Sequence, residues 1–84
     1  MKADLELVES VRAGDKAAFS ELVSRHQKAL SRMVMRFTHD LEVAEEVVQD
    51  AFIKAYEKIA GFEGRSSFKS WLYQIAINTA KNTI

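Results

Sequence analysis

The sequence predicts an all-α domain, a compact bundle of three long helices preceded by one short N-terminal helix. Apolar residues recur at intervals of three and four through most of the 84-residue chain, which is the spacing of a helix face. No stretch alternates apolar and polar residues as a half-buried strand does. The chain has no proline, so its three glycines, Gly14, Gly61 and Gly64, are the strongest signals for helix ends.

The first two helices are separated by Gly14. A short helix is expected over residues 5–13, with an apolar side made of Leu5, Val8 and Val11. Asp15 is a favoured N-cap residue, so a second helix is expected from about Lys16 to Thr38. The apolar face of this second helix consists of Phe19, Leu22, Val23, Leu30, Met33, Val34 and Phe37.

The opposite face of the second helix is basic. Its stripe consists of Arg25, Lys28, Arg32 and Arg36, spaced by three, four and four residues. A solvated face is the usual explanation of such a stripe, and contact with a polyanion or an acidic partner is the alternative.

The third helix is expected to begin after the N-cap Asp40 and to run to about Ala60, with Gly61 at its end. Its buried stripe is predicted to be Val43, Val47, Ala51, Phe52, Ala55 and Ile59. Val48, Ile53 and Tyr56 lie off the centre of this stripe. The helix is therefore either packed between two neighbours or binds a partner through its outer face.

A loop over residues 61–66 precedes the fourth helix, which is capped by Ser66 or Ser67. The core side of this helix is predicted to contain Phe68, Leu72, Ile75, Ala76 and Thr79, with Trp71 at its margin. Tyr73 and Ile77 are predicted to point away from the core. Helices joined by such short connections are expected to pack directly on one another.

Composition indicates one domain that folds in the cytoplasm. Hydrophobic residues make up 48% of the chain, there is no cysteine, and no apolar run approaches the ~20 residues of a membrane span. The N-terminal residues lack the apolar region of a signal peptide. We therefore expect no insertion into a membrane.

The net charge is zero, which argues against indiscriminate binding to duplex DNA, but the charge is unevenly distributed. Residues 1–50 carry 7 basic and 10 acidic groups, a balance of −3, whereas residues 51–84 carry 5 and 2, a balance of +3. The acidic groups Asp40, Glu42, Glu45, Glu46 and Asp50 form a block without intervening basic residues. This block is either a partner surface or a complement to the helix dipole.

No pattern of catalytic or metal-binding residues is present. His26 borders the apolar face of the second helix and is expected to be structural, whereas His39 is expected to be exposed. Glu45 and Glu46 are adjacent, so they point about 100° apart on a helix and cannot act as a carboxylate pair. We therefore expect no enzymatic activity, no cofactor and no metal site.

Nucleic-acid binding is the function class that the loop and fourth helix favour. Phe62, Phe68, Trp71 and Tyr73 fall within twelve residues, together with Arg65 and Lys69. Bases stack on flat rings and phosphates require positive charge, so the pattern is typical of single-strand binding. The loop is longer than the 3–4-residue turn of a helix-turn-helix motif. Aromatic residues at helical spacing are more often core, however, and for Phe68 we expect that role.

Two segments, GDKAAFSELVSRHQ and EEVVQDAFIKAYEKIAGFEGRSSFKSWLYQIAINTAKN, resemble region 2 of bacterial extracytoplasmic-function sigma factors (group IV, sigma-E type). With the spacing between them, they cover about residues 5–84. The resemblance implies a domain that binds core RNA polymerase and recognises and helps melt the promoter −10 element. It also implies that a flipped base of the single-stranded non-template strand is captured in the loop before the last helix.

The resemblance also implies the position of each surface. The polymerase surface, which contacts the β′ clamp helices, falls on Glu46, Val48, Gln49, Asp50 and Ile53. The promoter surface comprises Lys54, Lys58, Phe62, Gly64, Arg65, Ser66, Tyr73, Gln74, Ile77, Asn78 and Lys81. Within it, Asn78 is suited to a base edge and Lys81 to a phosphate.

Members of this group are commonly held inactive by an anti-sigma factor, so such a partner is also expected. The resemblance further implies that residues 1–84 form region 2 alone, without the domain that reads the −35 element. Because loop residues decide which base fits, the preferred −10 sequence is not predicted. A helical module that binds a regulatory protein, without nucleic-acid activity, is the alternative function.

Overall fold

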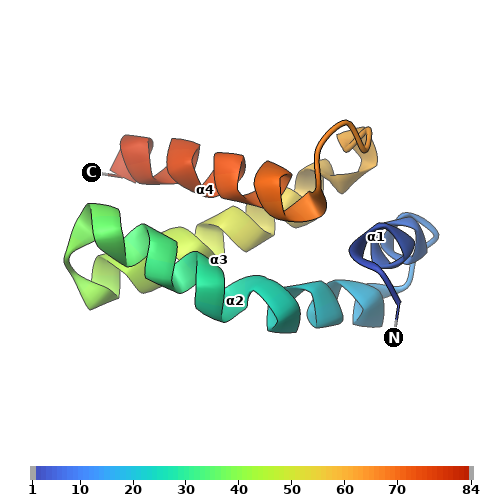
Figure 1. The fold of residues 1–84 in the computed structure, drawn as a ribbon, viewed down its shortest axis with the longest axis horizontal. Helices are drawn as coiled ribbons and strands as arrows, with labels where there is room; N and C mark the ends of the chain where they lie inside the picture. The colour runs from blue at the N-terminus through green and yellow to red at the C-terminus, as the bar shows by residue number, and fades with distance from the viewer. Residues whose placement is uncertain (1, 84) are drawn as a thin grey trace.

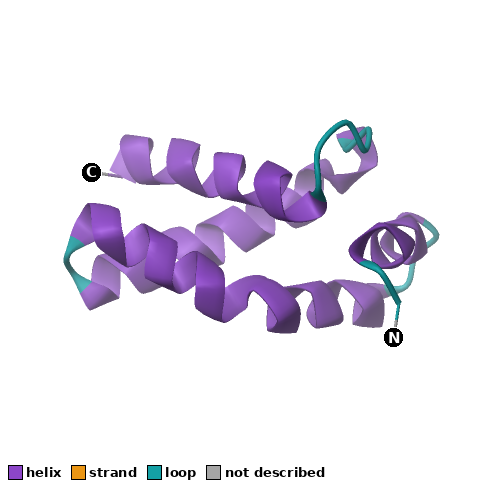
Figure 2. Cartoon of the chain, viewed as in Figure 1, coloured by secondary structure: helices purple, strands orange, loops and turns teal. Residues whose placement is uncertain are grey.

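Helices form nearly all of residues 2–83, which is the part of the chain that the computed structural model describes. They are α1 (Asp4–Arg12), α2 (Lys16–Thr38), α3 (Leu41–Lys58) and α4 (Phe68–Thr83), with a 3-10 turn over Ile59–Gly61. Figure 2 shows only helices and loops in these residues. The predicted all-α bundle of three long helices and one short one is confirmed.

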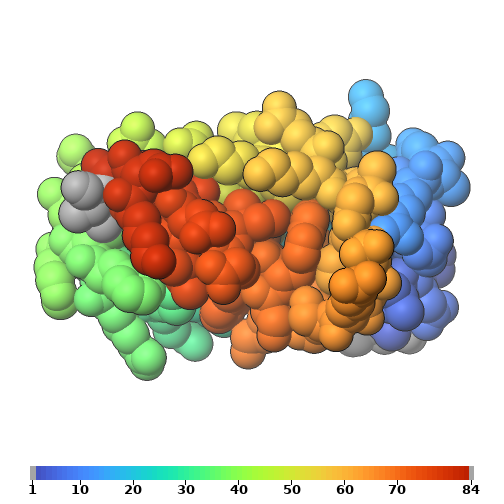
Figure 3. Space-filling view, turned by 90° about the horizontal axis from the view of Figure 1, so that it is seen from above, coloured from blue at the N-terminus to red at the C-terminus, as the bar shows by residue number. Residues whose placement is uncertain are grey.

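The three long helices lie lengthwise and α1 lies across one end (Figure 1). α3 returns along α2 after a tight turn, and α4 packs on both of them. α1 packs on α2 near its first turns and contacts the 3-10 turn. Seen from above, α4 occupies the centre of one face, and the loop before it lies between α4 and α1 (Figure 3). This arrangement brings residues near the N-terminus close to the loop.

Local hydrogen bonds set the beginning of each long helix. The carboxylate of Asp15 accepts from the N–H of Ala17 at 3.0 Å, and that of Asp40 accepts from Val43 at 3.2 Å. The hydroxyl of Ser67 accepts from the N–H of Ser70 at 3.0 Å, so Ser67 is the cap of α4. Each bond satisfies a backbone donor that has no partner within the helix. Both predicted aspartate caps are confirmed.

The core lies where α2, α3 and α4 meet, and α1 closes one end of it. Its largest fully buried side chains are Val8, Leu22, Leu30, Val34, Val47, Leu72 and Thr79. Thr79 is the one buried polar residue among the described residues, and its hydroxyl donates to the carbonyl of Ile75 at 2.8 Å. This bond removes the cost of burying an unpaired hydroxyl.

Three predicted core positions lie elsewhere. Leu5 is 55% exposed, and Leu7 takes its place in the core because α1 turns residues 7, 8 and 11 toward α2. Phe37 is 54% exposed on the last turn of α2. In α3, Val43 is half-buried and its neighbour Ala44 is buried instead.

Val48 was predicted to lie outside the core stripe of α3, and this prediction is wrong. Its side chain is 4% exposed. α3 packs on α2 along one side and on α4 along another, so a wide arc of its surface is buried. Ile53 and Tyr56 remain 57% and 42% exposed, respectively, although the Tyr56 ring also lies edge to face on Phe19 of α2, with centroids 5.0 Å apart.

Candidate nucleic-acid interface

The loop between the 3-10 turn and α4 is short and exposed from Glu63 to Ser67. Gly64 has φ 76°, a left-handed conformation that side chains disfavour. Arg65 Nε lies 3.6 Å from the Glu63 carboxylate, but their side chains are 86% and 68% exposed. An ion pair that is this exposed contributes little to stability, so the arginine is available to a binding partner. The loop therefore presents a cation and several backbone groups to solvent.

Phe62 was expected to offer its ring to a base, and the structure places it in the core instead. The residue is 3% exposed. Its ring centroid lies 6.3 Å from that of Phe68, edge to face, and 5.1 Å from that of Trp71. The ring closes the end of the bundle beneath the loop, where an unfilled space would forfeit packing contacts. Phe62 thus supports the loop and is not a free stacking surface.

A cleft of about 300 Å³ lies between this loop and the beginning of α1. Its loop side is lined by Phe62, Gly64, Ser66, Ser67 and Phe68, and its α1 side by Ala3, Asp4 and Leu5. We refer to it as the loop cleft. Sequence reasoning did not find the α1 side, because no local pattern links residues some sixty positions apart.

Asp4 is held at this cleft by two side chains of α2, Arg25 and His26. Its carboxylate lies 2.7 Å from His26 Nε2 and accepts from Arg25 Nη1 at 3.1 Å. Arg25 also donates to Glu21 at 2.8 Å. The ring of His26 packs near Phe68, with centroids 5.5 Å apart. The structural role predicted for His26 is confirmed, and Arg25 is drawn out of the basic stripe into this network.

The outer face of α4 presents polar and cationic groups. Gln74 and Asn78 are exposed one turn apart, with their amides 3.4 Å from one another. Lys81 is also exposed, and the ammonium of Lys69 lies 5.5 Å from the centre of the Tyr73 ring. Tyr73 and Ile77, expected to point away from the core, are both half-buried, and Ile77 lines a cleft together with Phe37 of α2. Amides suit base edges and ammonium groups suit phosphates.

The two lysines of α3 are placed differently from each other. Lys54 is half-buried and donates to the hydroxyl of Thr79 at 3.3 Å. It therefore lies at the contact between α3 and the C-terminal half of α4. Lys58 is exposed on the last turn of α3, before the 3-10 turn. Of the two lysines, Lys58 is therefore the more available to a bound strand.

The predicted polymerase surface is largely brought together on α3. Glu46, Gln49, Asp50 and Ile53 are all exposed and recur at intervals of three and four, so they share one face. Val48 is the exception, since it is buried on the side of α3 that meets α2 and lies near Met35. The face that remains is acidic with one large apolar side chain, Ile53.

The exposed groups of the loop, α4 and α3 are suited to binding a partner. Among residues 2–83, no group of three or more histidine, aspartate or glutamate side chains is arranged to hold a metal ion. Within the same residues, no helix has the length and apolar character required to cross a bilayer. The fold and its exposed surfaces define a helical recognition domain with one cationic and one acidic face.

Comparison with known proteins gives this domain its family. Residues 22–84 match the family model of sigma-70 region 2, so the chain belongs to the sigma-70 region 2 family. It is 52% identical to the RNA polymerase sigma-H factor of Pseudomonas aeruginosa over 79 residues, 94% of this chain and 41% of that protein. It is 49% identical, with the same coverage, to the ECF RNA polymerase sigma-E factor of Escherichia coli K12. Within the family it is of the extracytoplasmic-function, sigma-E and sigma-H type.

Solved structures agree with this assignment. An engineered region 2 of sigmaE, determined in complex with GTAAAA, is 44% identical and superposes with a TM-score of 0.89 over 96% of this chain and 84% of that one. CnrH, determined in complex with the cytosolic domain of CnrY, is 31% identical with a TM-score of 0.87, over 96% of this chain and 53% of that one. The chain spans about two fifths of the length of the curated relatives that it matches. Sigma factors are non-enzymatic subunits of transcription initiation.

Proposed function

We propose that this domain recognises the promoter −10 element and helps to open it, as part of a sigma factor bound to core RNA polymerase in the cytoplasm. The observation that carries the proposal is the continuous surface formed by the loop and α4, which contains no acidic residue from Gly64 to the end of the chain. The cations on such a surface attract the phosphates of a strand. The complex of a related region 2 with GTAAAA supports the same function.

In this proposal, the loop cleft receives the flipped base. The rings of Phe62 and Phe68 are 3% and 2% exposed, so they form its floor but offer little area for stacking. Recognition therefore depends on polar groups at the rim, where Asp4 can accept from an exocyclic amine and Ser66 can donate or accept. Extruding a base from the duplex costs a few kcal/mol. Binding of the base in the cleft needs to offset only part of this cost if other parts of the strand are bound as well.

The outer face of α4 supplies the additional binding. Asn78 is placed to hydrogen-bond a base edge, and Lys81 one turn later to bind a phosphate. Arg65 and Lys58 flank the loop and are exposed for further phosphates. In this arrangement the amide contributes to sequence preference, whereas the cations contribute affinity that depends on salt.

The acidic face of α3 is the proposed contact for the β′ clamp helices. Glu46, Gln49 and Asp50 provide polar contacts around the exposed Ile53, which is the type of apolar side chain that a partner buries. Since promoter strand and polymerase would bind different faces, both could be engaged together. An anti-sigma factor is a further proposed partner, supported by the complex of CnrH with the cytosolic domain of CnrY.

Fluorescence anisotropy with a labelled single-stranded oligonucleotide that contains GTAAAA tests the DNA-binding proposal. We expect tighter binding to this oligonucleotide than to a scrambled one, with the preference reduced by Asn78→Ala. We expect Lys81→Ala to weaken both complexes and to lower the slope of log K against log[salt] by about 0.7. Lys16→Ala, which removes an exposed lysine of the first turn of α2 that is not part of the proposed promoter surface, is the matched control and should change little. Equal affinity for both oligonucleotides in the wild type would contradict the proposal.

A further inference from the structure

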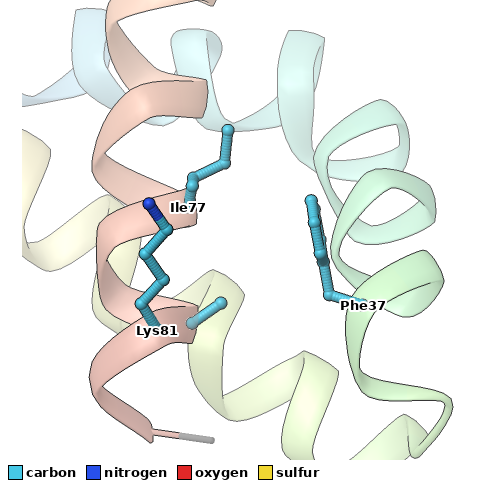
Figure 4. A pocket seen from close by; sticks show the side chains of 4 residues that line it. Phe37, Ile77 and Lys81 are labelled. Carbon is cyan, nitrogen blue, oxygen red and sulfur yellow. The ribbon is translucent and has the colours of Figure 1, made fainter.

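A second cleft lies between the C-terminal ends of α2 and α4, away from the loop. It measures about 310 Å³ and is lined by Phe37, Ile77, Ala80 and Lys81. Figure 4 shows Phe37 and Ile77 projecting from facing helices into the same space, with Lys81 one turn beyond Ile77. We refer to it as the α2–α4 cleft. Its volume is at the lower end of the range for small-ligand sites, which is about 300–1,000 Å³.

The walls of this cleft are apolar and aromatic. Phe37 is 54% exposed and Ile77 is half-buried, so both retain surface for a partner. A single exposed apolar side chain needs no explanation. Phe37 and Ile77, however, face one another across the cleft. A flat ring placed between them can contact one side chain with each of its faces. The cleft is therefore shaped for a planar apolar group.

The charged residue that lines the cleft is a cation, Lys81. The chain contains 12 acidic residues, but none lies between positions 22 and 38 of α2 or beyond position 63. Lys81 is exposed, so its ammonium is available to an occupant of the cleft. This distribution favours an occupant that carries negative charge beside its planar group, and it disfavours an isolated neutral ligand.

The cleft is continuous with the proposed promoter surface. Lys69, Tyr73, Ile77 and Lys81 recur every four residues and form one ridge along α4, from the loop to the cleft. Twelve helical residues span about 18 Å, which corresponds to about five nucleotides at the 3.4 Å spacing of stacked DNA. A strand held at the loop cleft can therefore reach the α2–α4 cleft along this ridge.

We infer that the α2–α4 cleft is a second base-binding site, which holds one unpaired nucleotide of the bound strand. The base lies against Phe37 and Ile77, and its phosphate contacts Lys81. This inference rests on the proposed DNA-binding function and adds to it a contact from α2, a helix that carries none of the predicted DNA-binding residues.

The test uses the labelled GTAAAA oligonucleotide, extended by several nucleotides on each side, and variants of Phe37. Loss of one base-stacking contact predicts that Phe37→Ala weakens binding by about 5- to 150-fold, and that Phe37→Tyr restores most of the affinity. An abasic scan of the oligonucleotide then locates the base. One abasic position should weaken binding to the wild type and have no further effect on Phe37→Ala, and it should lie within about five nucleotides of the base held at the loop.

Two controls separate the possible outcomes. Leu41→Ala removes another apolar side chain of similar exposure, 62%, on α3, and should leave binding unchanged. Circular dichroism confirms that each variant remains helical. If Phe37→Ala binds within twofold of the wild type while Asn78→Ala loses sequence preference, the second site is overturned and the proposed function stands. If the wild type binds no single strand, both are overturned.

Discussion

Substituting Phe62 distinguishes a core side chain from a DNA-contacting one. The sequence suggested a ring exposed in the loop, but the residue is 3% exposed and packs on Phe68 and Trp71. If this placement is correct, Phe62→Ala reduces stability and affects DNA binding only through the support that the ring gives to the loop. Phe62→Leu, which keeps most of the apolar volume, should retain most of the stability and the DNA binding.

The magnitude follows from what the ring contacts. Truncating a buried phenylalanine to alanine costs about 3–5 kcal/mol, depending on how far the surroundings relax. Phe62 borders the loop cleft, so water and loop atoms can enter the space, and this favours the lower end of that range. We therefore expect a loss of about 3 kcal/mol. For a domain of this size, that loss lowers Tm by about 12–24 °C.

Urea denaturation followed by circular dichroism measures this loss, and the GTAAAA oligonucleotide measures binding at a temperature where the variant is folded. Phe62→Leu is expected to lose about 1 kcal/mol, as volume-conserving core changes do. The reasoning would be refuted if Phe62→Ala were as stable as the wild type within about 0.5 kcal/mol and yet lost DNA binding. That combination would mean that the ring leaves the core to contact the strand.

Two further predictions concern the loop and α3. Gly64→Ala should lower the free energy of unfolding, measured by urea denaturation, by about 1–2 kcal/mol, because Gly64 has φ 76° and a side chain strains the backbone there. Gly61→Ala is the matched control and should be nearly neutral, since Gly61 has open space around it and no positive φ. Gln49→Ala combined with Asp50→Ala should abolish pull-down of a β′ clamp-helix fragment without loss of helicity, since both side chains are exposed on the acidic face of α3. Continued capture of the fragment by the double variant would place the polymerase surface elsewhere.

The sequence alone was sufficient to predict the number, order and approximate bounds of the helices. Helix beginnings depend on a side chain that bonds to a backbone N–H two or three residues later, and Asp15 and Asp40 both do so. The spacing of apolar residues located the main core positions, such as Leu22, Val47 and Leu72. These features are local, so they can be read without knowing how the helices pack. The same long pattern was also sufficient to indicate the family.

Side chains at the margins of the apolar stripes could not be placed in this way. Whether Val48 is buried depends on how closely α2 crosses α3, and whether Phe62 is exposed depends on the space beneath the loop. Helical spacing gives the direction of a side chain relative to its own helix, but not the position of the neighbouring helix. For this reason, two of the predicted binding residues were found in the core.

Contacts between distant segments were decided by the tertiary structure alone. The beginning of α1 completes the loop cleft through Asp4, which is fixed by His26 and Arg25 of α2. Phe37 faces Ile77 only because the ends of α2 and α4 lie side by side. The sequence thus determined the helices and the residue types suited to binding a strand. Packing determined which of them share a cleft, because the partners are separated by about forty to sixty positions and no local rule connects them.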